Sequence, residues 1–335
     1  MREQAGYMRK WIFQMFRRQR DADCNFERGI QMSENLLTDR YVILSFNGEE
    51  AAGHGSEQNR KNHFLVAARF LELLTDGKLE EKNGEYALGK NLEAAESFGS
   101  IFKDKSGYYP LQSWMDAIAG LPGKVCSDMR QKKLEALIDA GTMDVIPSLL
   151  ESDCDYRMNG IKENAYRSDF NRYRSEKALL KNAVLKNTLT DADVCLIWLL
   201  CRDGKWDEIF LPEERKEFEE VLKEVPAKNA FIRGLTACRI EVAPEKGLSR
   251  FLSGSEAGKR QDTIFIETET MFPNGEECIN AVKSILESNG HICELKSTGS
   301  IPVMEIDNIL YTLTPDAKRV RVMNIHGVIV SRYHG

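Results

Sequence analysis

Short groups of Gly, His, Ser and Asp residues have the composition of catalytic or nucleotide-binding motifs. Gly53–Ser56 places a histidine beside a hydroxyl, but no carboxylate partner for nucleophilic catalysis can be assigned to it. Gly254–Lys259 reads GxxxGK, one residue shorter than a P-loop, and Arg260 stands where Ser or Thr should contact magnesium. Asp191 and Asp193 could ligate a divalent cation, although carboxylates in the opening turn of a helix also complement its dipole. No catalytic constellation remains, so we expect a protein that is not an enzyme and uses no cofactor.

The cysteine and histidine residues do not have the spacing of a metal site. Eight cysteines and five histidines are dispersed along the chain, and no CxxC pair occurs among them. We therefore expect reduced thiols and no metal. The N-terminus lacks the apolar stretch and cleavage site of a secretory signal, and no apolar run reaches the ~18 to 20 residues of a spanning helix. These features predict a cytoplasmic protein, which could still be peripheral at a membrane.

Positive charge recurs on two predicted helices, and either could line an anion site. Arginine offers a planar fork that suits phosphate oxygens, so Arg130 and the pair Arg172 and Arg174 are the most informative members. The alternative is a solvated helix face. The two sets are Lys124, Arg130, Lys132 and Lys133 on the first helix, and Arg167, Arg172, Arg174, Lys177, Lys181 and Lys186 on the second.

The length and charge of the chain limit the classes to which the protein can belong. The chain has 335 residues, 42% of them hydrophobic and 29% charged, which is typical of a folded protein of about two domains. The net charge is -6, but residues 1–20 hold six Lys and Arg and one acidic residue. An acidic bulk argues against extensive binding to nucleic acid, whereas a short basic arm suits an anionic lipid or an acidic partner.

The basic arm also has an amphipathic pattern. On a helix, the apolar side chains of residues 7–16 would cover about half the circumference, and basic residues fill the rest. The apolar residues are Tyr7, Met8, Trp11, Ile12, Phe13, Met15 and Phe16, and the basic ones are Arg9, Lys10, Arg17 and Arg20. That pattern is typical of a helix lying in a membrane interface. The alternative is a helix docked on its own domain or on a second subunit. Residues 1–32 are therefore predicted to be a basic amphipathic segment.

Residues 33–238 are predicted to form a mainly helical domain with interspersed β-hairpins. Asn83-Gly84 favours a type I′ turn between alternating strands over 79–88, and a second hairpin is expected from Val145–Leu150 and the residues before Asn164. Caps at Ser33 and Thr190, and Pro212 at a first-turn position, mark helix starts. The predicted helices cover 36–46, 64–77, 91–102, 111–119, 126–140, 167–186, 191–201 and 212–224, with another ending near 238.

The pattern changes after this region. Residues 239–262 contain Gly, Ser and charged residues and are predicted to be a linker. A small α+β domain is expected over 263–335. It would contain strands at 263–267, 292–296, 303–313 and 319–332 and one helix at 274–287.

Several stretches between Leu36 and about Val225 resemble the Golgi phosphoprotein 3 family. They are Asp39–Phe46, Phe70–Leu79, Leu111–Met115, Leu134–Gly141, and Asp191–Leu200 leading into Trp206 and Phe210. The resemblance implies a mainly helical domain with hairpins. It also implies a non-enzymatic peripheral membrane protein that recognises phosphatidylinositol 4-phosphate and, in eukaryotes, retains Golgi glycosyltransferases. The hairpin around Met143 to Tyr156 would serve self-association, and so a homo-oligomer.

The family's lipid-binding residues carry over only in part. Arg130 falls on the second arginine of an Arg-x-x-Arg pair, whereas Ser127 occupies the first. No Trp lies between Asn47 and Arg69, and Val66 stands at another arginine position. These departures argue against selective phosphoinositide recognition and leave contact with an anionic surface.

We therefore predict an adaptor that binds an anionic lipid or a phosphate group, with the protein partner undefined. The predicted lipid- or phosphate-binding residues are Arg130, Arg60, Lys61 and Lys124, and those of membrane contact are Trp11, Phe13, Phe16, Arg17 and Arg18. A soluble protein-interaction module whose C-terminal sheet adds or receives a strand is the alternative. A weaker one is nucleic-acid binding by the helix at 126–140 and the following hairpin.

Overall fold

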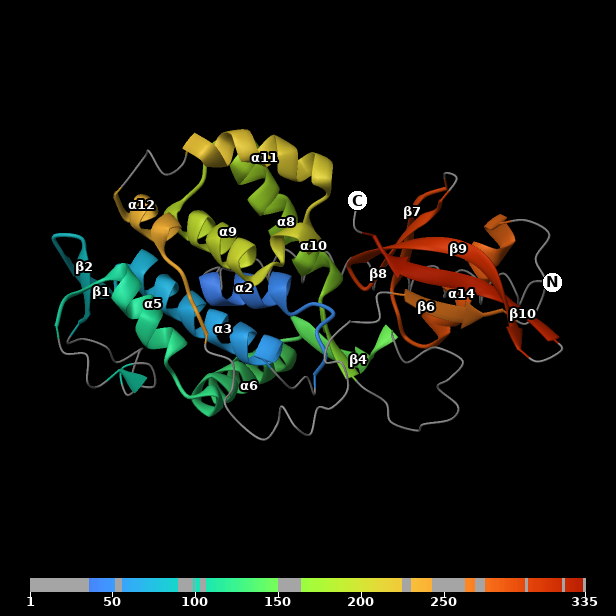
Figure 1. The fold of residues 1–335 in the computed structure, drawn as a ribbon, viewed down its shortest axis with the longest axis horizontal. Helices are drawn as coiled ribbons and strands as arrows, with labels where there is room; N and C mark the ends of the chain where they lie inside the picture. The colour runs from blue at the N-terminus through green and yellow to red at the C-terminus, as the bar shows by residue number, and fades with distance from the viewer. Residues whose placement is uncertain are drawn as a thin grey trace, which may run out of the picture. The chain divides into compact units, whose positions relative to one another are not determined.

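A computed structural model of the chain shows a mixed α/β protein in which Leu37–Gly335 form one compact unit (Figure 1). The structure describes residues 36–51, 56–89, 99, 101–102, 107–149, 164–224, 230–242, 263–268, 275–298, 301–320 and 323–333. The predicted amphipathic segment with Trp11, Phe13, Phe16, Arg17 and Arg18 lies outside these residues. So do most of the predicted linker and nearly all of the predicted helix at 91–102. None of the described helices is both long enough and apolar enough to cross a bilayer.

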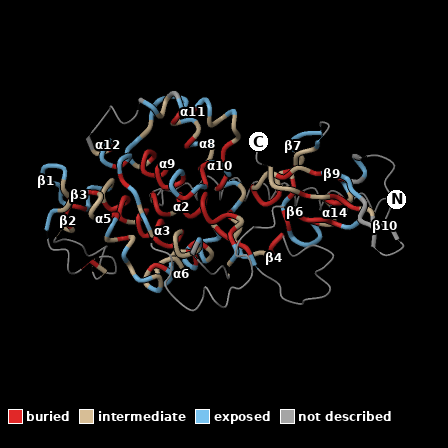
Figure 2. The backbone as a smooth tube through the Cα atoms, viewed as in Figure 1, coloured by how far each residue is buried: buried red, intermediate tan, exposed pale blue. Residues whose placement is uncertain are grey.

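Nine labelled helices precede the C-terminal sheet in the described chain. They are α2 (Leu37–Ser45), α3 (Ser56–Thr75), α5 (Leu111–Ala119), α6 (Gly123–Asp139), α8 (Phe170–Leu185), α9 (Asp191–Asp203), α10 (Trp206–Ile209), α11 (Pro212–Glu224) and α12 (Ala230–Ala237). α2 packs against α3, α8 and α9 and is buried along almost its whole length (Figure 2). Its one buried arginine, Arg40, forms ion pairs with Glu176 on α8 and Asp193 on α9, both at 2.9 Å. The charges of α2 are therefore neutralised inside the helical layer.

Two short antiparallel hairpins interrupt these helices, as the sequence predicts. β1 (Leu79–Lys82) pairs with β2 (Glu85–Leu88), and Asn83 and Gly84 have φ values of 55° and 79°, which suit a type I′ turn. β3 (Tyr109–Pro110) adds to β2. The second hairpin pairs β4 (Met143–Pro147) with β5 (Asn164–Ser168). The prediction for its second strand was wrong, because that strand begins at Asn164 rather than ending before it.

Within the described residues, the C-terminal part is a five-stranded antiparallel sheet with one helix. Its strands are β6 (Thr263–Glu267), β7 (Cys293–Ser297), β8 (Val303–Ile306), β9 (Ile309–Val320) and β10 (Met323–Arg332), in the order β6-β10-β9-β8-β7, and the helix is α14 (Gly275–Ser288). The single strand predicted over 303–313 is divided in the structure. Asp307 and Asn308 both adopt positive φ, at 49° and 69°, and so form the tight turn that joins β8 to β9.

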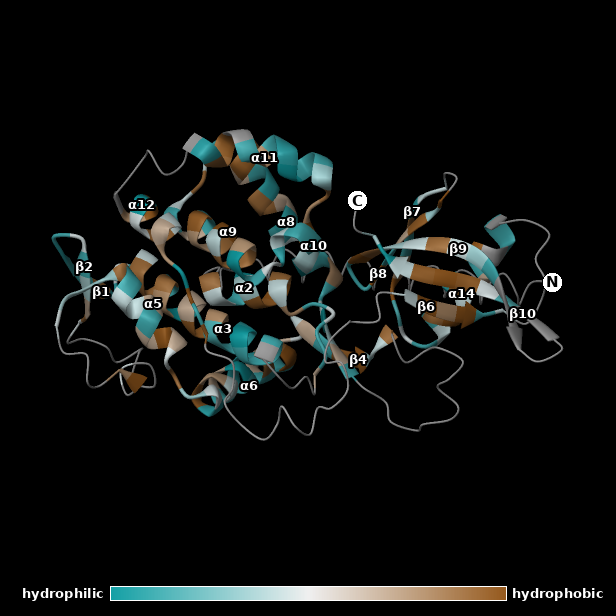
Figure 3. Ribbon diagram, in the orientation of Figure 1, coloured by the Kyte–Doolittle hydropathy of each residue, from teal (hydrophilic) through white to brown (hydrophobic). Residues whose placement is uncertain are grey.

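The unit contains two hydrophobic cores. The first lies among the helices, where the Phe70 and Trp114 rings stack with centroids 5.1 Å apart. The second lies between α14 and the C-terminal sheet. Figure 3 shows the corresponding pattern, with hydrophobic stretches in the strands of the C-terminal sheet and a largely hydrophilic α11.

Polar contacts join the helical region to the C-terminal sheet at the β8-β9 turn. The Asn47 amide donates to the Asp307 carbonyl oxygen at 2.9 Å, and the Asn308 amide donates to the Ser168 carbonyl oxygen at 3.1 Å. Arg167 lies 3.3 Å from the Asp307 carboxylate, which also accepts from the buried His291 ring at 2.6 Å. The sheet is thus attached through buried polar groups.

Candidate anion-binding pocket

A pocket of about 480 Å³ lies where α8 and α10 face strands β7 to β9. One face of α8 forms a wall of this pocket, because residues 173, 174, 177, 178 and 181 recur at helical spacing. The side chains that line it are Tyr173, Arg174, Lys177, Ala178, Lys181, Glu208, Ile209, Leu211, Lys296, Ser297, Val303, Glu305, Asn308, Leu310 and Tyr333. The pocket therefore combines an apolar interior surface with four cationic residues.

Arg174 and Lys296 are held by carboxylates of the sheet. The Arg174 guanidinium lies 3.8 Å from the Phe170 ring centroid and forms ion pairs with Glu294 and, at 3.0 Å, with Glu305. Lys296 forms ion pairs with the same two carboxylates at 2.9 and 2.8 Å. Burial alone would raise the pKa of Glu305, but hydrogen bonds from Arg174 and Lys296 lower it overall. Glu305 therefore stays ionised as the shared counter-ion.

Lys181 and Lys177 lie one helical turn apart on α8 but differ in their partners. The Lys181 ammonium pairs with Glu214 on α11 at 2.6 Å. Lys177 is half-buried, and no carboxylate among the described residues pairs with it. Its ammonium lies 5.5 Å from the centroid of the Phe210 ring, a cation–π contact. Lys177 is therefore the cation of this pocket that lacks a counter-ion within the described structure.

The pKa of Lys177 reflects this environment. Burial lowers it from the usual 10.5, and the nearby positive charges of Lys181 and Lys296 lower it further, against the opposing attraction of Glu214 and Glu305. An anion entering the pocket would favour the charged form of Lys177 and relieve part of the cost of burying it. The electrostatics of the pocket thus favour an anionic ligand.

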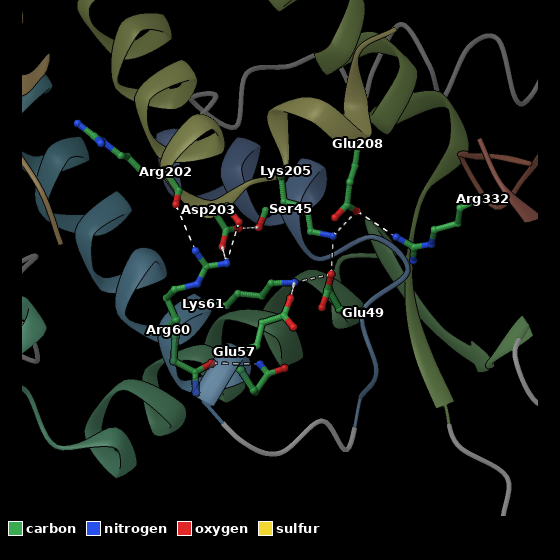
Figure 4. Close-up of polar contacts among 12 residues, drawn as sticks. Ser45, Glu49, Glu57, Arg60, Lys61, Arg202, Asp203, Lys205, Glu208 and Arg332 are labelled. Carbon is green, nitrogen blue, oxygen red and sulfur yellow. Dashed lines mark hydrogen bonds and ion pairs between the residues drawn. The ribbon is translucent and has the colours of Figure 1, made fainter. Parts of the chain in front are cut away.

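The structure places Lys61, one of the predicted phosphate ligands, in a buried ion-pair network (Figure 4). Its side chain is 1% exposed, and its ammonium lies 2.5 Å from Glu49 and 3.6 Å from Glu57. Lys205 contacts the same Glu49 oxygen at 2.5 Å. Burial and the charge of Lys205 lower the pKa of Lys61, while Glu49 opposes that shift. The prediction that Lys61 contacts a surface anion does not fit this arrangement, because the side chain is enclosed and already neutralised.

The network continues from Lys205 toward the C-terminal sheet. The Lys205 ammonium lies 2.7 Å from Glu208, and the same carboxylate oxygen lies 3.2 Å from Arg332 on β10. Glu208 also lines the pocket. The buried network and the pocket therefore share a carboxylate.

Arg60 also contacts other groups of the protein (Figure 4). Its guanidinium donates to the carbonyl oxygens of Asp203 at 3.1 Å and Arg202 at 3.4 Å, at the C-terminal end of α9. It also lies 3.9 Å from the Asp203 carboxylate. A cation at the C-terminus of a helix complements the helix dipole. This structural role is sufficient to account for a basic side chain at position 60.

The two predicted ligands on α6 have different surroundings. Arg130 is half-buried and donates from one terminal nitrogen to the Ala51 carbonyl oxygen at 3.3 Å, whereas its buried Nε has no hydrogen-bond partner in the described structure. Lys124 is exposed in the first turn of α6. Of the four residues predicted from sequence, Arg60, Lys61 and Arg130 thus contact groups of the protein itself, and Lys124 is exposed.

The motifs considered for chemistry have structural roles where the structure describes them. Thr190 and Asp193 form a reciprocal capping box at the start of α9, and Asp193 also pairs with Arg40. Burial raises the pKa of the Cys126 and Cys293 thiols to about 12, so neither is activated as a nucleophile. Among the described residues, no group of three His, Cys, Asp or Glu side chains is placed to hold a metal. The segments Gly53–Gly55 and Gly254–Lys259 lie outside the described residues.

Sequence reasoning identified the α8 half of the pocket and missed the rest. Arg174, Lys177 and Lys181 are among the basic residues singled out on this helix. Arg172 is directed elsewhere, to Glu176 at 2.9 Å. Nothing in the sequence indicated that Lys296 or Asn308 would face α8, since both are more than 100 residues away along the chain.

The sequence was compared with protein-family models and with curated proteins, and it matches none of them.

Proposed function

We propose that the protein is a non-enzymatic adaptor, peripheral to a membrane, that binds an anionic lipid headgroup or another phosphate-bearing group without transforming it. The observation that carries the proposal is the half-buried Lys177, which has no counter-ion among the described residues and lies in a pocket open to a ligand. A phosphate oxygen accepting from this ammonium would form a charge-assisted hydrogen bond. The basic N-terminal segment would add attraction to an anionic surface.

The order of the described elements supports the finer proposal that residues 36–225 have a fold like that of the Golgi phosphoprotein 3 family. Two helices, α2 and α3, precede the first hairpin, and α5 and α6 precede the second. The helices α8, α9 and α11 then follow. The resemblance implies helices with interspersed hairpins, and this order is compatible with that proposal. Arg130 and Lys124 on α6 remain a second proposed contact with the lipid.

The test is vesicle flotation of the full chain. Vesicles of neutral phosphatidylcholine would be compared with vesicles that also contain phosphatidylserine or phosphatidylinositol 4-phosphate. One charge-assisted hydrogen bond to phosphate contributes about 1.5 to 3 kcal/mol, so Lys177→Gln should weaken binding to anionic vesicles by at least about tenfold. Lys186→Gln is the matched control, because Lys186 is an exposed lysine just after the same helix and lies outside the pocket lining.

Further variants separate the proposed contacts. Arg130→Gln tests α6, and a chain truncated to begin at Met32 tests the basic segment. Binding that falls only on truncation would place the function in the N-terminal segment and refute the pocket as the lipid site. Failure to float on any vesicle would refute the membrane proposal and leave the soluble protein-interaction module as the leading account.

A further inference from the structure

Asn308, one residue of the pocket lining, ties the pocket to the helical region. Asn308 is 7% exposed, and its amide nitrogen donates to the Ser168 carbonyl oxygen at 3.1 Å and to Asn47 at 3.3 Å. These two acceptors fix the orientation of the amide. The Asn308 Oδ1 atom is buried and accepts no hydrogen bond in the described structure. Because this atom has almost no accessible surface, Asn308 supports the wall of the pocket and does not offer an acceptor to a ligand.

Most of the pocket surface is apolar. The contributing residues come from α8, from α10 and the segment after it, and from strands β8 and β9, and they are Tyr173, Ala178, Ile209, Leu211, Val303 and Leu310. A free phosphate ion would leave this surface in contact with water. The volume of about 480 Å³ lies within the range typical of sites for small organic molecules.

The charged side chains of the described lining other than Lys177 have partners of opposite charge. Arg174 and Lys296 share Glu294 and Glu305, Lys181 has Glu214, and Glu208 accepts from Lys205 and Arg332. One unmet requirement remains among the charged side chains of the described lining, a negative charge for Lys177. A single ligand that places an anionic group on Lys177 would also cover apolar surface of the pocket.

We infer that this pocket binds a single amphipathic organic anion, a molecule with one phosphate, sulfonate or carboxylate group and an apolar body. The anionic group contacts Lys177, and the body lies against Tyr173 and Leu310. The inference rests on the pocket used in the proposed function and specifies its ligand as one molecule rather than a membrane surface.

The test uses two dyes that differ in charge. Anilinonaphthalene sulfonate has an aromatic body, an N–H donor and a sulfonate, and N-phenyl-1-naphthylamine has the same body and donor without the sulfonate. Fluorescence titration of the full chain should show saturable binding of the sulfonate dye at one site and at least about tenfold weaker binding of the uncharged dye. Inorganic phosphate should compete only weakly, because it lacks the apolar body.

Two variants test where the anionic group and the apolar body of the ligand bind. Lys177→Gln should weaken the binding of the sulfonate dye by at least about tenfold and leave the binding of the uncharged dye unchanged. Ala178→Phe, at an exposed position of α8 that lines the pocket, should weaken both dyes because the new ring fills the space for the body. Lys186→Gln should change neither. Circular dichroism of each variant checks that the fold is retained.

The inference is overturned if Lys177→Gln leaves the sulfonate dye unaffected, or if phosphate binds as tightly as the dye. Vesicle flotation separates it from the proposed function. Flotation that depends on Lys177, without binding of the soluble dye, would retain the adaptor and refute the small-molecule ligand. Dye binding that depends on Lys177, without flotation, would retain the ligand and refute the membrane role.

Discussion

Replacing Glu49 by Gln should destabilise the protein more than any exposed carboxylate does. The Glu49 oxygen lies 2.5 Å from both the Lys61 and the Lys205 ammonium, whose side chains are 1% and 4% exposed. Breaking a buried ion pair costs about 3 to 5 kcal/mol, because an uncompensated charge remains inside. Each lysine keeps one other carboxylate, Glu57 at 3.6 Å and Glu208 at 2.7 Å. We therefore expect a loss of about 3 kcal/mol, at the lower end of that range.

The assay is urea unfolding at neutral pH, followed by the fluorescence of the buried tryptophans Trp114, Trp198 and Trp206. Glu81→Gln is the control, since Glu81 is exposed on β1, and its effect should stay within about 0.5 kcal/mol. Adding Lys61→Met to Glu49→Gln should restore part of the loss, because one of the two unpaired charges is removed.

The loss of unfolding free energy caused by Glu49→Gln should also depend on pH. Burial lowers the pKa of Lys61 from 10.5, so the charged lysine opposes folding below its folded-state pKa, and stability is regained as pH rises toward 10.5. Loss of Glu49 lowers that pKa further, so the difference between the wild type and Glu49→Gln should shrink at alkaline pH. A loss below about 1 kcal/mol at neutral pH, or one equal to that of Glu81→Gln, would show that the network does not carry this energy.

Two other predictions test the C-terminal sheet and its attachment. Glu305 has a lowered pKa in the folded state, so its contribution to stability is present above its usual value of 4.5 and is lost as pH falls. Glu305→Gln should therefore cost about 1 kcal/mol at neutral pH, and denaturant unfolding should show the gap to the wild type closing in acid; a constant gap would contradict this account. A Cβ on Gly327 would collide with the Ile266 carbonyl oxygen and the Phe265 ring, so Gly327→Ala should cost about 1 to 3 kcal/mol and speed amide hydrogen exchange in β6. Unchanged exchange in β6 would mean that the strands shift without loss of pairing.

Local sequence signals predicted the described elements that depend on local chemistry. Asn83 and Gly84 tolerate positive φ, Thr190 offers its hydroxyl to an N-terminal amide, and Pro212 suits a first helical turn. Each of these effects acts within a few residues, so each can be recognised in the chain itself. The division of the predicted strand at Asp307-Asn308 was missed, because the flanking apolar residues continue the strand pattern on both sides.

The candidate site could not be predicted from local sequence signals, because it depends on contacts between residues far apart in the chain. A lysine on a basic helix has the same appearance in a sequence whether or not it has a counter-ion. Lys61 and Lys177 both lie on helices. Lys61 is buried and forms an ion pair with Glu49. The carboxylates near Lys177 instead form ion pairs with other cations, Lys181, Arg174 and Lys296.

The sequence by itself therefore determined the mixed order of helices and hairpins, the strand-rich C-terminal region and the basic face of α8. These features follow from periodicity, caps and turn residues, which are local properties of the chain. Only the tertiary structure decided which cation is unpaired and that Asn308, from the β8-β9 turn, faces the same pocket. Charge compensation and hydrogen-bond satisfaction depend on distances of a few Å between groups far apart in sequence, and only the packing of helices against the sheet sets those distances.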